Sequence, residues 1–350
     1  MARSCDGCRL ATSITNHTVK IYSRDNLDFQ TELACTKPIV ALECSVTHPQ
    51  LVFAACEDGA VMRWDLRAPP QPQLRCVVAQ HGAETYSMAI GFGDALCAVG
   101  GASAITFYDL RAAAAPPRAA AGAAAAKPLG AYEDAHTDLV TCLAFRPGAP
   151  SQLASASEDG LVCVFEAAAA AGAEPVVAVL NAECPVRRVG FFGPGAAGVW
   201  AATGSEGLSL WHAPSAQRVA EFGGAALRRP RGAADYLVGC RYDAAADTLA
   251  LVAGTFGGEV QVSAVTPAGV AAPAAVGAAG ARGHAAVVRA FDWAGQSLIT
   301  GGEDARLCCW SFDSSGGAAA AAAPAPQAQV LRHKGSRAER RAADAPYSRR

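Results

Sequence analysis

Short runs of apolar residues alternate with tight polar turns along most of the chain. In residues 153–165 an apolar run leads into a turn at Asp159, and a second apolar run follows and ends in an aromatic residue. Residues 298–310 repeat this order around Asp304, and residues 52–65 repeat it around an Asp-Gly pair. Apolar runs bounded by such turns are typical of paired β-strands. Each unit therefore predicts a strand, a tight turn and a second strand.

The predicted second strands recur at a regular interval. Their last positions are aromatic or apolar and are Tyr22, Trp64, Tyr108, Phe165, Trp211, Val262 and Trp310. Successive positions are 42 to 57 residues apart, and the longest spacing contains an alanine-rich insert at 112–126. A period in the forties with paired strands is typical of a propeller, in which four-stranded sheets are arranged radially. Seven units of this kind predict an all-β chain with seven sheets.

Particular residues within these units resemble those of the WD-repeat family. They are the Trp64-Asp65 pair, the Gly283-His284 pair upstream of Trp310, and the Asp-Gly turns. The resemblance spans about residues 9–333. It implies an all-β, seven-bladed WD-repeat β-propeller.

The two ends of the chain fall outside that predicted propeller. Residues 1–8 are expected to form an N-terminal tail, and residues 334–350 a basic C-terminal tail. The resemblance implies that the first and last strands share one blade, which removes free sheet edges. Because residues 1–8 do not have the pattern of a strand, the first blade is expected to be incomplete. It would then have three strands, or the sequence would lack a native N-terminal segment.

The resemblance also implies a buried hydrogen-bonded set of one His, one Ser or Thr, one Asp and one Trp within a blade. Matched by position, the seventh blade has all four members and the fourth blade has three, namely His284, Thr300, Asp304 and Trp310, and His136, Ser155 and Asp159. In the fourth blade Phe165 replaces the Trp, which removes an N–H donor. In the second blade Trp64 is present but Ala54 stands at the hydroxyl position. A complete set rigidifies a blade, so the seventh blade is expected to be the most rigid.

Three members of the set, His284, Thr300 and Asp304, also have the composition of a hydrolase triad. Their spacing is that of the structural set, and we interpret them as structural. Other catalytic patterns are missing from the sequence: there is no Gly-Lys phosphate loop, no His-Glu-x-x-His zinc helix and no Gly-x-Ser-x-Gly turn. Cys5 and Cys8 form a lone Cys-x-x-Cys pair without two further ligands nearby. We therefore expect no enzymatic activity, no cofactor and no metal.

Two arginines stand at equivalent positions in neighbouring predicted blades. The segments are Trp64-Asp65-Leu66-Arg67 and Tyr108-Asp109-Leu110-Arg111. Their spacing resembles the WDxR signature of substrate receptors of the cullin-4 ubiquitin ligase, which implies Arg67 and Arg111 as candidate partner-binding residues and a ligase adaptor as partner. An exposed Arg can pair bidentately with carboxylates or backbone oxygens. In the alternative interpretation each Arg forms a local ion pair with the preceding Asp, which contributes little at a surface.

Charge and cysteine content limit the partners and the compartment. A net charge of −2 argues against a nucleic-acid footprint across the whole domain. The arginine-rich residues 332–350 fit nuclear import, a nucleic-acid contact or a solvated tail. The 13 cysteines are an odd number, and several lie within apolar runs, as reduced thiols do. Without an apolar signal or membrane-spanning stretch, we expect an intracellular protein of the nucleus, or of nucleus and cytoplasm.

Taken together, the pattern predicts a non-enzymatic scaffold that mediates protein–protein interactions. The alternative is a substrate receptor of a cullin-4 ubiquitin ligase that uses the WDxR motifs. The sequence does not specify which face of the propeller binds or which proteins are bound.

Overall fold

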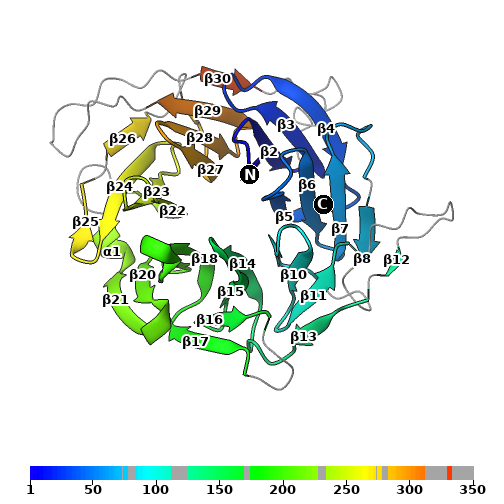
Figure 1. Cartoon of the computed structure of the whole chain (residues 1–350). Coiled ribbons are helices and arrows are strands. Elements are labelled where there is room, and N and C mark those ends of the chain that lie inside the picture. The colour runs from blue at the N-terminus through cyan, green and yellow to red at the C-terminus, as the bar shows by residue number, and fades with distance from the viewer. Residues whose placement is uncertain are drawn as a thin grey trace, which may run out of the picture.

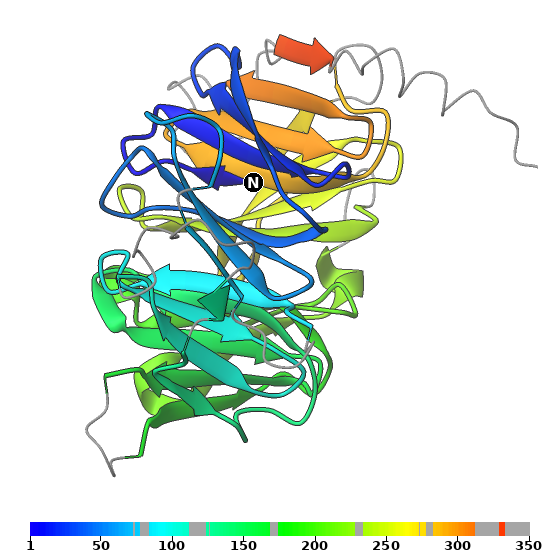
Figure 2. The ribbon, with the colours of Figure 1, turned by 90° about the vertical axis from the view of Figure 1, so that its right-hand side faces the viewer.

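Seven small antiparallel sheets form a ring in the computed structural model, which describes residues 1–72, 74–77, 84–111, 124–125, 127–168, 174–227, 234–272, 274–277, 283–311 and 329–332. Figure 1 shows the seven sheets as blades around a common axis, in chain order. Figure 2 shows the same ring turned by 90°, with the first blade (blue) packed against the last (orange). The predicted all-β, seven-bladed propeller is confirmed.

Blades 1, 4, 5 and 7 each contain four consecutive strands. From the innermost strand outward, blade 1 is β1 (Ala2–Arg3), β2 (Arg9–Ile14), β3 (Thr18–Ser23) and β4 (Phe29–Ala34). Blade 4 is β14 (Val140–Arg146), β15 (Ala149–Ser157), β16 (Leu161–Glu166) and β17 (Val176–Asn181). Blade 5 is β18 (Val186–Phe192), β19 (Gly198–Thr203), β20 (Leu208–His212) and β21 (Gln217–Phe222). Blade 7 is β27 (Val288–Ala294), β28 (Ser297–Gly302), β29 (Arg306–Ser311) and β30 (Gln329–Arg332).

Blades 2, 3 and 6 follow the same plan with local changes. Blade 2 is β5 (Ile39–Cys44), β6 (Leu51–Cys56), β7 (Ala60–Asp65) and β8 (Leu74–Val77), with β12 (Ala124–Ala125) added in parallel to β8. Blade 3 is β9 (Ser87–Gly91), β10 (Leu96–Gly100), β11 (Ile105–Asp109) and the short β13 (Gly130–Tyr132). Blade 6 is β22 (Tyr236–Asp243), β23 (Thr248–Gly254) and β24 (Val260–Thr266), which pairs with both β25 (Gly269–Val270) and β26 (Ala274–Gly277). The described helical segments are single turns, η2 (Pro194–Ala196), η3 (Ala213–Ser215) and α1 (Gly224–Leu227).

The core lies between the blades. All six residues of β19 are buried, whereas β17 at the outer edge of its blade alternates between buried and exposed positions. Strands covered on both faces read as continuous apolar runs, and strands covered on one face alternate. The largest fully buried side chains include Trp64, Trp211 and Phe165. These aromatic residues end the predicted second strands, which is why the blade period could be recognised in the sequence.

The first blade differs from the prediction. Ala2 and Arg3 pair with Ala11 and Leu10, so β1 is the innermost strand of a four-stranded blade, and residues 1–8 are not a strandless tail. A turn that follows β1 is held by Ser4, whose Oγ accepts the N–H of Arg9 and donates to Asp6. Two residues are too few to give an alternating pattern, so this strand carried no signal in the sequence.

The ring closes without an exchanged strand among the described residues, in contrast to the expectation that the first and last strands share a blade. Side chains join blade 1 to blade 7 instead. Arg24 Nε donates to Asp292 Oδ2 at 2.8 Å, and Arg3 donates to the Trp293 carbonyl at 3.0 Å. Beside them Leu10 and Ile299 pack in one apolar cluster. An ion pair and a small apolar contact therefore close the seam.

Candidate functional site

The four predicted members of the blade 7 set lie together in the structure. His284 Nε2 is 2.8 Å from Thr300 Oγ1, and His284 Nδ1 is 3.0 Å from Asp304 Oδ1. Trp310 Nε1 donates to the same Thr300 hydroxyl at 2.8 Å. Because Trp N–H only donates and a carboxylate only accepts, Trp310 donates to Thr300 and His284 Nδ1–H donates to Asp304. In the neutral imidazole the other ring nitrogen accepts, so Thr300 then donates to His284 Nε2.

The blade 4 set has the same geometry with one member fewer. His136 Nε2 is 2.7 Å from Ser155 Oγ, and His136 Nδ1 is 3.0 Å from Asp159 Oδ2. Phe165, at the position of Trp310, is buried and supplies no N–H. The Ser155 hydroxyl therefore bonds to the imidazole without a Trp donor.

Blade 2 shows the opposite defect. Trp64 is fully buried, and its Nε1 has no hydrogen-bond partner in the structure. Ala54 is the counterpart of Thr300 and offers no hydroxyl group. An unpaired buried N–H of this kind costs about 1–3 kcal/mol. The buried indole N–H is therefore unpaired in blade 2, whereas the equivalent N–H of blade 7 has a hydrogen-bond acceptor.

Both histidines are out of reach of a substrate. The side chains of His136 and His284 are 0% exposed. Gly302 lies directly against the blade 7 set, because a Cβ at this position would be only 2.6 Å from His284 Nδ1. Gly302 carries no recognisable signal in the sequence, because its role depends on close approach rather than on a motif. In the described part of the chain, no three His, Cys, Asp or Glu residues are grouped so as to hold a metal ion.

Burial and hydrogen bonding set the charge states of these groups. Burial lowers the pKa of His136 below its ordinary value of 6.5, against the opposing attraction of Asp159. Burial alone would raise the pKa of Asp159, but hydrogen bonds from the Thr137 and Leu161 amides and from His136 hold it below the usual value. The pKa of Asp304 is lowered in the same way, by the Ala285 amide and His284.

These shifts predict a loss of stability in acid. A His whose pKa is lowered on folding takes up a proton on unfolding, so its contribution to stability is full above pH 6.5 and declines as pH falls below it. Protonation of Asp159 and Asp304 adds a second decline below about pH 4. Urea unfolding between pH 7.5 and about 3 should show both declines. His136→Asn should flatten the first. An unchanged slope in that variant would contradict the assignment.

Arg67 and Arg111 occupy equivalent exposed positions where β7 and β11 end. Arg67 Nε and Nη2 donate to Asp65 at 2.9 and 2.6 Å. Arg111 Nε and Nη2 donate to Asp109 at 3.1 and 3.0 Å. The two Arg side chains are 72% and 76% exposed. Each guanidinium therefore forms the local ion pair of the alternative interpretation and still presents its outer edge to solvent.

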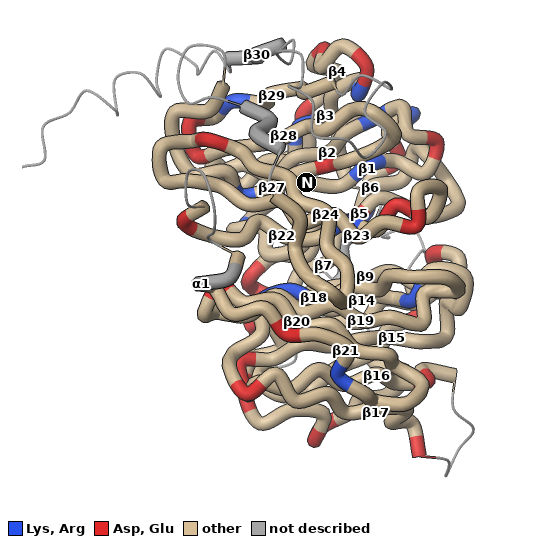
Figure 3. The backbone as a smooth tube through the Cα atoms, turned by 90° about the vertical axis from the view of Figure 1, so that its left-hand side faces the viewer, with Lys and Arg blue, Asp and Glu red and all other residues tan. Residues whose placement is uncertain are grey.

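The remaining predicted features fall at the chain termini and on the surface. Cys5 and Cys8 are exposed free thiols beside the turn after β1. The arginine-rich tail 334–350 lies outside the described residues. Acidic and basic residues are scattered over the loops in Figure 3 rather than gathered in one stripe. No described helix is long and apolar enough to span a bilayer.

Comparisons with known proteins agree with this architecture. The WD domain, G-beta repeat family matches residues 127–166, which contain β13 of blade 3 and β14 to β16 of blade 4. WD repeat-containing protein GTS1 of Arabidopsis thaliana is 27% identical over 331 residues, covering 88% of this chain and 79% of that protein. The WD repeat-containing protein 89 homolog of Dictyostelium discoideum is 27% identical over 313 residues, covering 87% and 80%. The resemblance to the WD-repeat family is confirmed. Residues 129–136, 235–239, 283–289 and 300–305 predict a likeness to WD repeat-containing protein 89, and the match to its homolog confirms that likeness.

Solved structures share the fold at low sequence identity. A chain in the crystal structure of a Mitotic Checkpoint Complex matches with a TM-score of 0.64 and 15% identity, over 89% of this chain and 88% of that one. The computationally designed Ika8 protein matches with a TM-score of 0.58 and 15% identity, over 89% and 82%. At this identity the likeness concerns the fold alone.

Proposed function

Because the chain is a WD-repeat β-propeller, we propose that it is a non-enzymatic scaffold whose rigid blades present loops and strand ends to other proteins. One observation carries the proposal: in the set that resembles a catalytic triad, His284 and Thr300 have no exposed surface, Asp304 is only 9% exposed, and the three bond to one another inside a blade. A rigid surface lowers the ordering cost of binding on its own side. Affinity purification of the tagged full chain from its native cells, with Thr300→Val as a destabilised control, should recover specific partners with the wild type.

A receptor role in a cullin-4 ubiquitin ligase is the second candidate, supported by the matched geometry of Arg67 and Arg111. Each guanidinium group lies just after the third strand of its blade, and the two blades are adjacent. Each still exposes N–H donors that could bind a partner's carboxylate or carbonyl oxygens. The double variant Arg67→Ala/Arg111→Ala should then reduce the amount of ligase adaptor recovered with the chain. Arg187→Ala/Arg289→Ala is the matched control, since it also removes two exposed arginines paired with glutamates. Equal adaptor recovery from all three proteins would exclude the receptor role.

Nuclear localisation is a separate proposal that depends on the C-terminal tail. Residues 332–350 contain many arginines and few acidic residues, as import segments do. Deletion of these residues should move a fluorescent fusion from the nucleus to the cytoplasm. A distribution unchanged by the deletion would reject the proposal, and glutamine substitution of the arginines would separate charge from length.

A further inference from the structure

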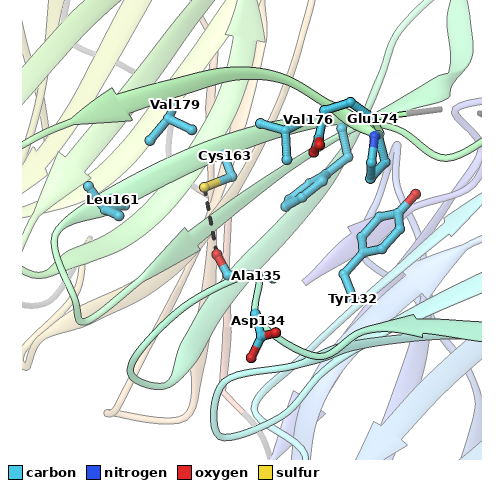
Figure 4. A pocket seen from close by; sticks show the side chains of 10 residues that line it. Tyr132, Asp134, Ala135, Leu161, Cys163, Glu174, Val176 and Val179 are labelled. Atoms are coloured by element: carbon cyan, nitrogen blue, oxygen red, sulfur yellow. Dashed lines mark hydrogen bonds between the residues drawn. The ribbon is translucent and has the colours of Figure 1, made fainter. Parts of the chain in front are cut away.

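A groove opens at the outer rim of the ring between blades 3 and 4. It encloses about 340 Å³ and is lined on one side by Tyr132 and Asp134, and on the other by β16 and β17. On the blade 3 side, β13 has only three residues, which pair with Ile105 to Phe107. On the blade 4 side, β17 has six residues. Figure 4 shows Tyr132 and Asp134 facing Leu161, Cys163 and Val179 across the space.

The floor of the groove is apolar and fixed in shape. Tyr132 stacks on Phe165 with ring centroids 4.8 Å apart, and Phe107 meets Tyr132 edge-on at 5.0 Å. The Cys163 thiol donates to the Ala135 carbonyl, which ties the segment after β13 to β16. Val179 is 51% exposed at the groove wall, a large exposure for an aliphatic residue in a strand. A partner could therefore bury apolar surface here without rearranging the blades.

The rim of the groove is acidic. Asp134 and Glu174 are both exposed, and neither forms an ion pair with a cation in the described ranges. Strand β17 is also the last strand of its sheet, so its outer edge offers backbone N–H and C=O groups to an added strand. An extended segment lying along β17 would place alternate side chains over the groove.

We propose that this groove binds an extended segment of a partner protein in which an aliphatic or aromatic side chain is flanked by lysine or arginine. The apolar side chain packs on Tyr132 and Val179, and the basic side chains pair with Asp134 and Glu174. The proposal rests on the scaffold role and adds a binding site and the chemistry of its ligand.

The test is selection of a random peptide phage library on the full chain, followed by fluorescence anisotropy with the selected peptides made synthetically. The wild type should enrich peptides with an apolar residue between basic ones. Val179→Asp should weaken their binding at least tenfold, and Asp134→Lys/Glu174→Lys should select acidic flanks instead. Val219→Asp is the matched control, because Val219 is 42% exposed on the outer strand of blade 5. It should bind the peptides as the wild type does.

Selected peptides that bind Val179→Asp as tightly as the wild type would overturn the groove site, and so would enrichment of neutral or acidic flanks, or no enrichment. None of these outcomes decides the scaffold role, which is judged from the proteins recovered with the full chain. Peptides that bind every variant equally would reject the groove without bearing on the scaffold role. Circular dichroism of each variant checks that its blades are folded.

Discussion

Asp292→Ala is expected to lower the free energy of unfolding by about 3–5 kcal/mol, the range found when one partner of a buried ion pair is removed. The Arg24 and Asp292 side chains are only 9% and 10% exposed. Without Asp292, Arg24 keeps a bond to the Ser297 carbonyl but loses its counter-ion, and Arg3 loses the same carboxylate at 3.6 Å. Urea unfolding followed by tryptophan fluorescence measures the change.

The size of this effect follows from the position of the pair. Neighbouring blades elsewhere in the ring are joined by the chain, whereas blades 7 and 1 meet only through side chains in the described residues. Glu221→Ala is the control, since it removes an exposed partner of Arg218 and should cost less than about 1 kcal/mol. If the two variants unfold at the same urea concentration, the seam does not depend on the ion pair. Replacing both partners, as Arg24→Met/Asp292→Leu, should restore much of the loss.

The sequence predicted the blades well because each carries its own signal. A run of apolar residues, a turn and a final aromatic residue lie close together in the chain, as in residues 153–165, and similar units recur 42 to 57 residues apart. The polar sets were predicted from the resemblance to the WD-repeat family, and their members could be matched because His284 and Asp304 are only 20 positions apart. Local patterns of this kind do not depend on the closure of the ring.

Features that depend on distant parts of the chain could not be predicted. Arg24 and Asp292 are 268 positions apart, and nothing near either residue indicates the other. The two-residue β1 is a strand only because β2 lies beside it. The groove between blades 3 and 4 is lined by residues of two different blades, Tyr132 of β13 and residues of β16 and β17. Arg67 and Arg111 were located correctly at exposed strand ends, but their pairing with the preceding aspartates was one of two alternatives.

Thr300→Val is expected to lower the free energy of unfolding by about 2–5 kcal/mol, because it leaves two buried groups without a partner at once. The Thr300 hydroxyl donates to His284 Nε2 and accepts from Trp310 Nε1, and all three side chains are buried. Valine keeps the shape of threonine, so the loss reports hydrogen bonding rather than a cavity. The change is measured by urea unfolding at pH 7.5.

Ala54→Ser in blade 2 is the reciprocal change and should raise stability by about 1 kcal/mol, the net value of one hydrogen bond. It places a hydroxyl ten residues before Trp64, as Thr300 stands ten before Trp310, and so gives the unpaired Trp64 Nε1 an acceptor. The two variants together isolate the contribution of the hydroxyl group to stability. Thr300→Val removes it from a complete set, and Ala54→Ser adds it to an incomplete one. Thr300→Val could instead lower the free energy of unfolding by less than about 1 kcal/mol while Ala54→Ser leaves it unchanged. In that case packing alone stabilises the blades, and the buried hydrogen bonds do not add to the stability of blade 2 or blade 7.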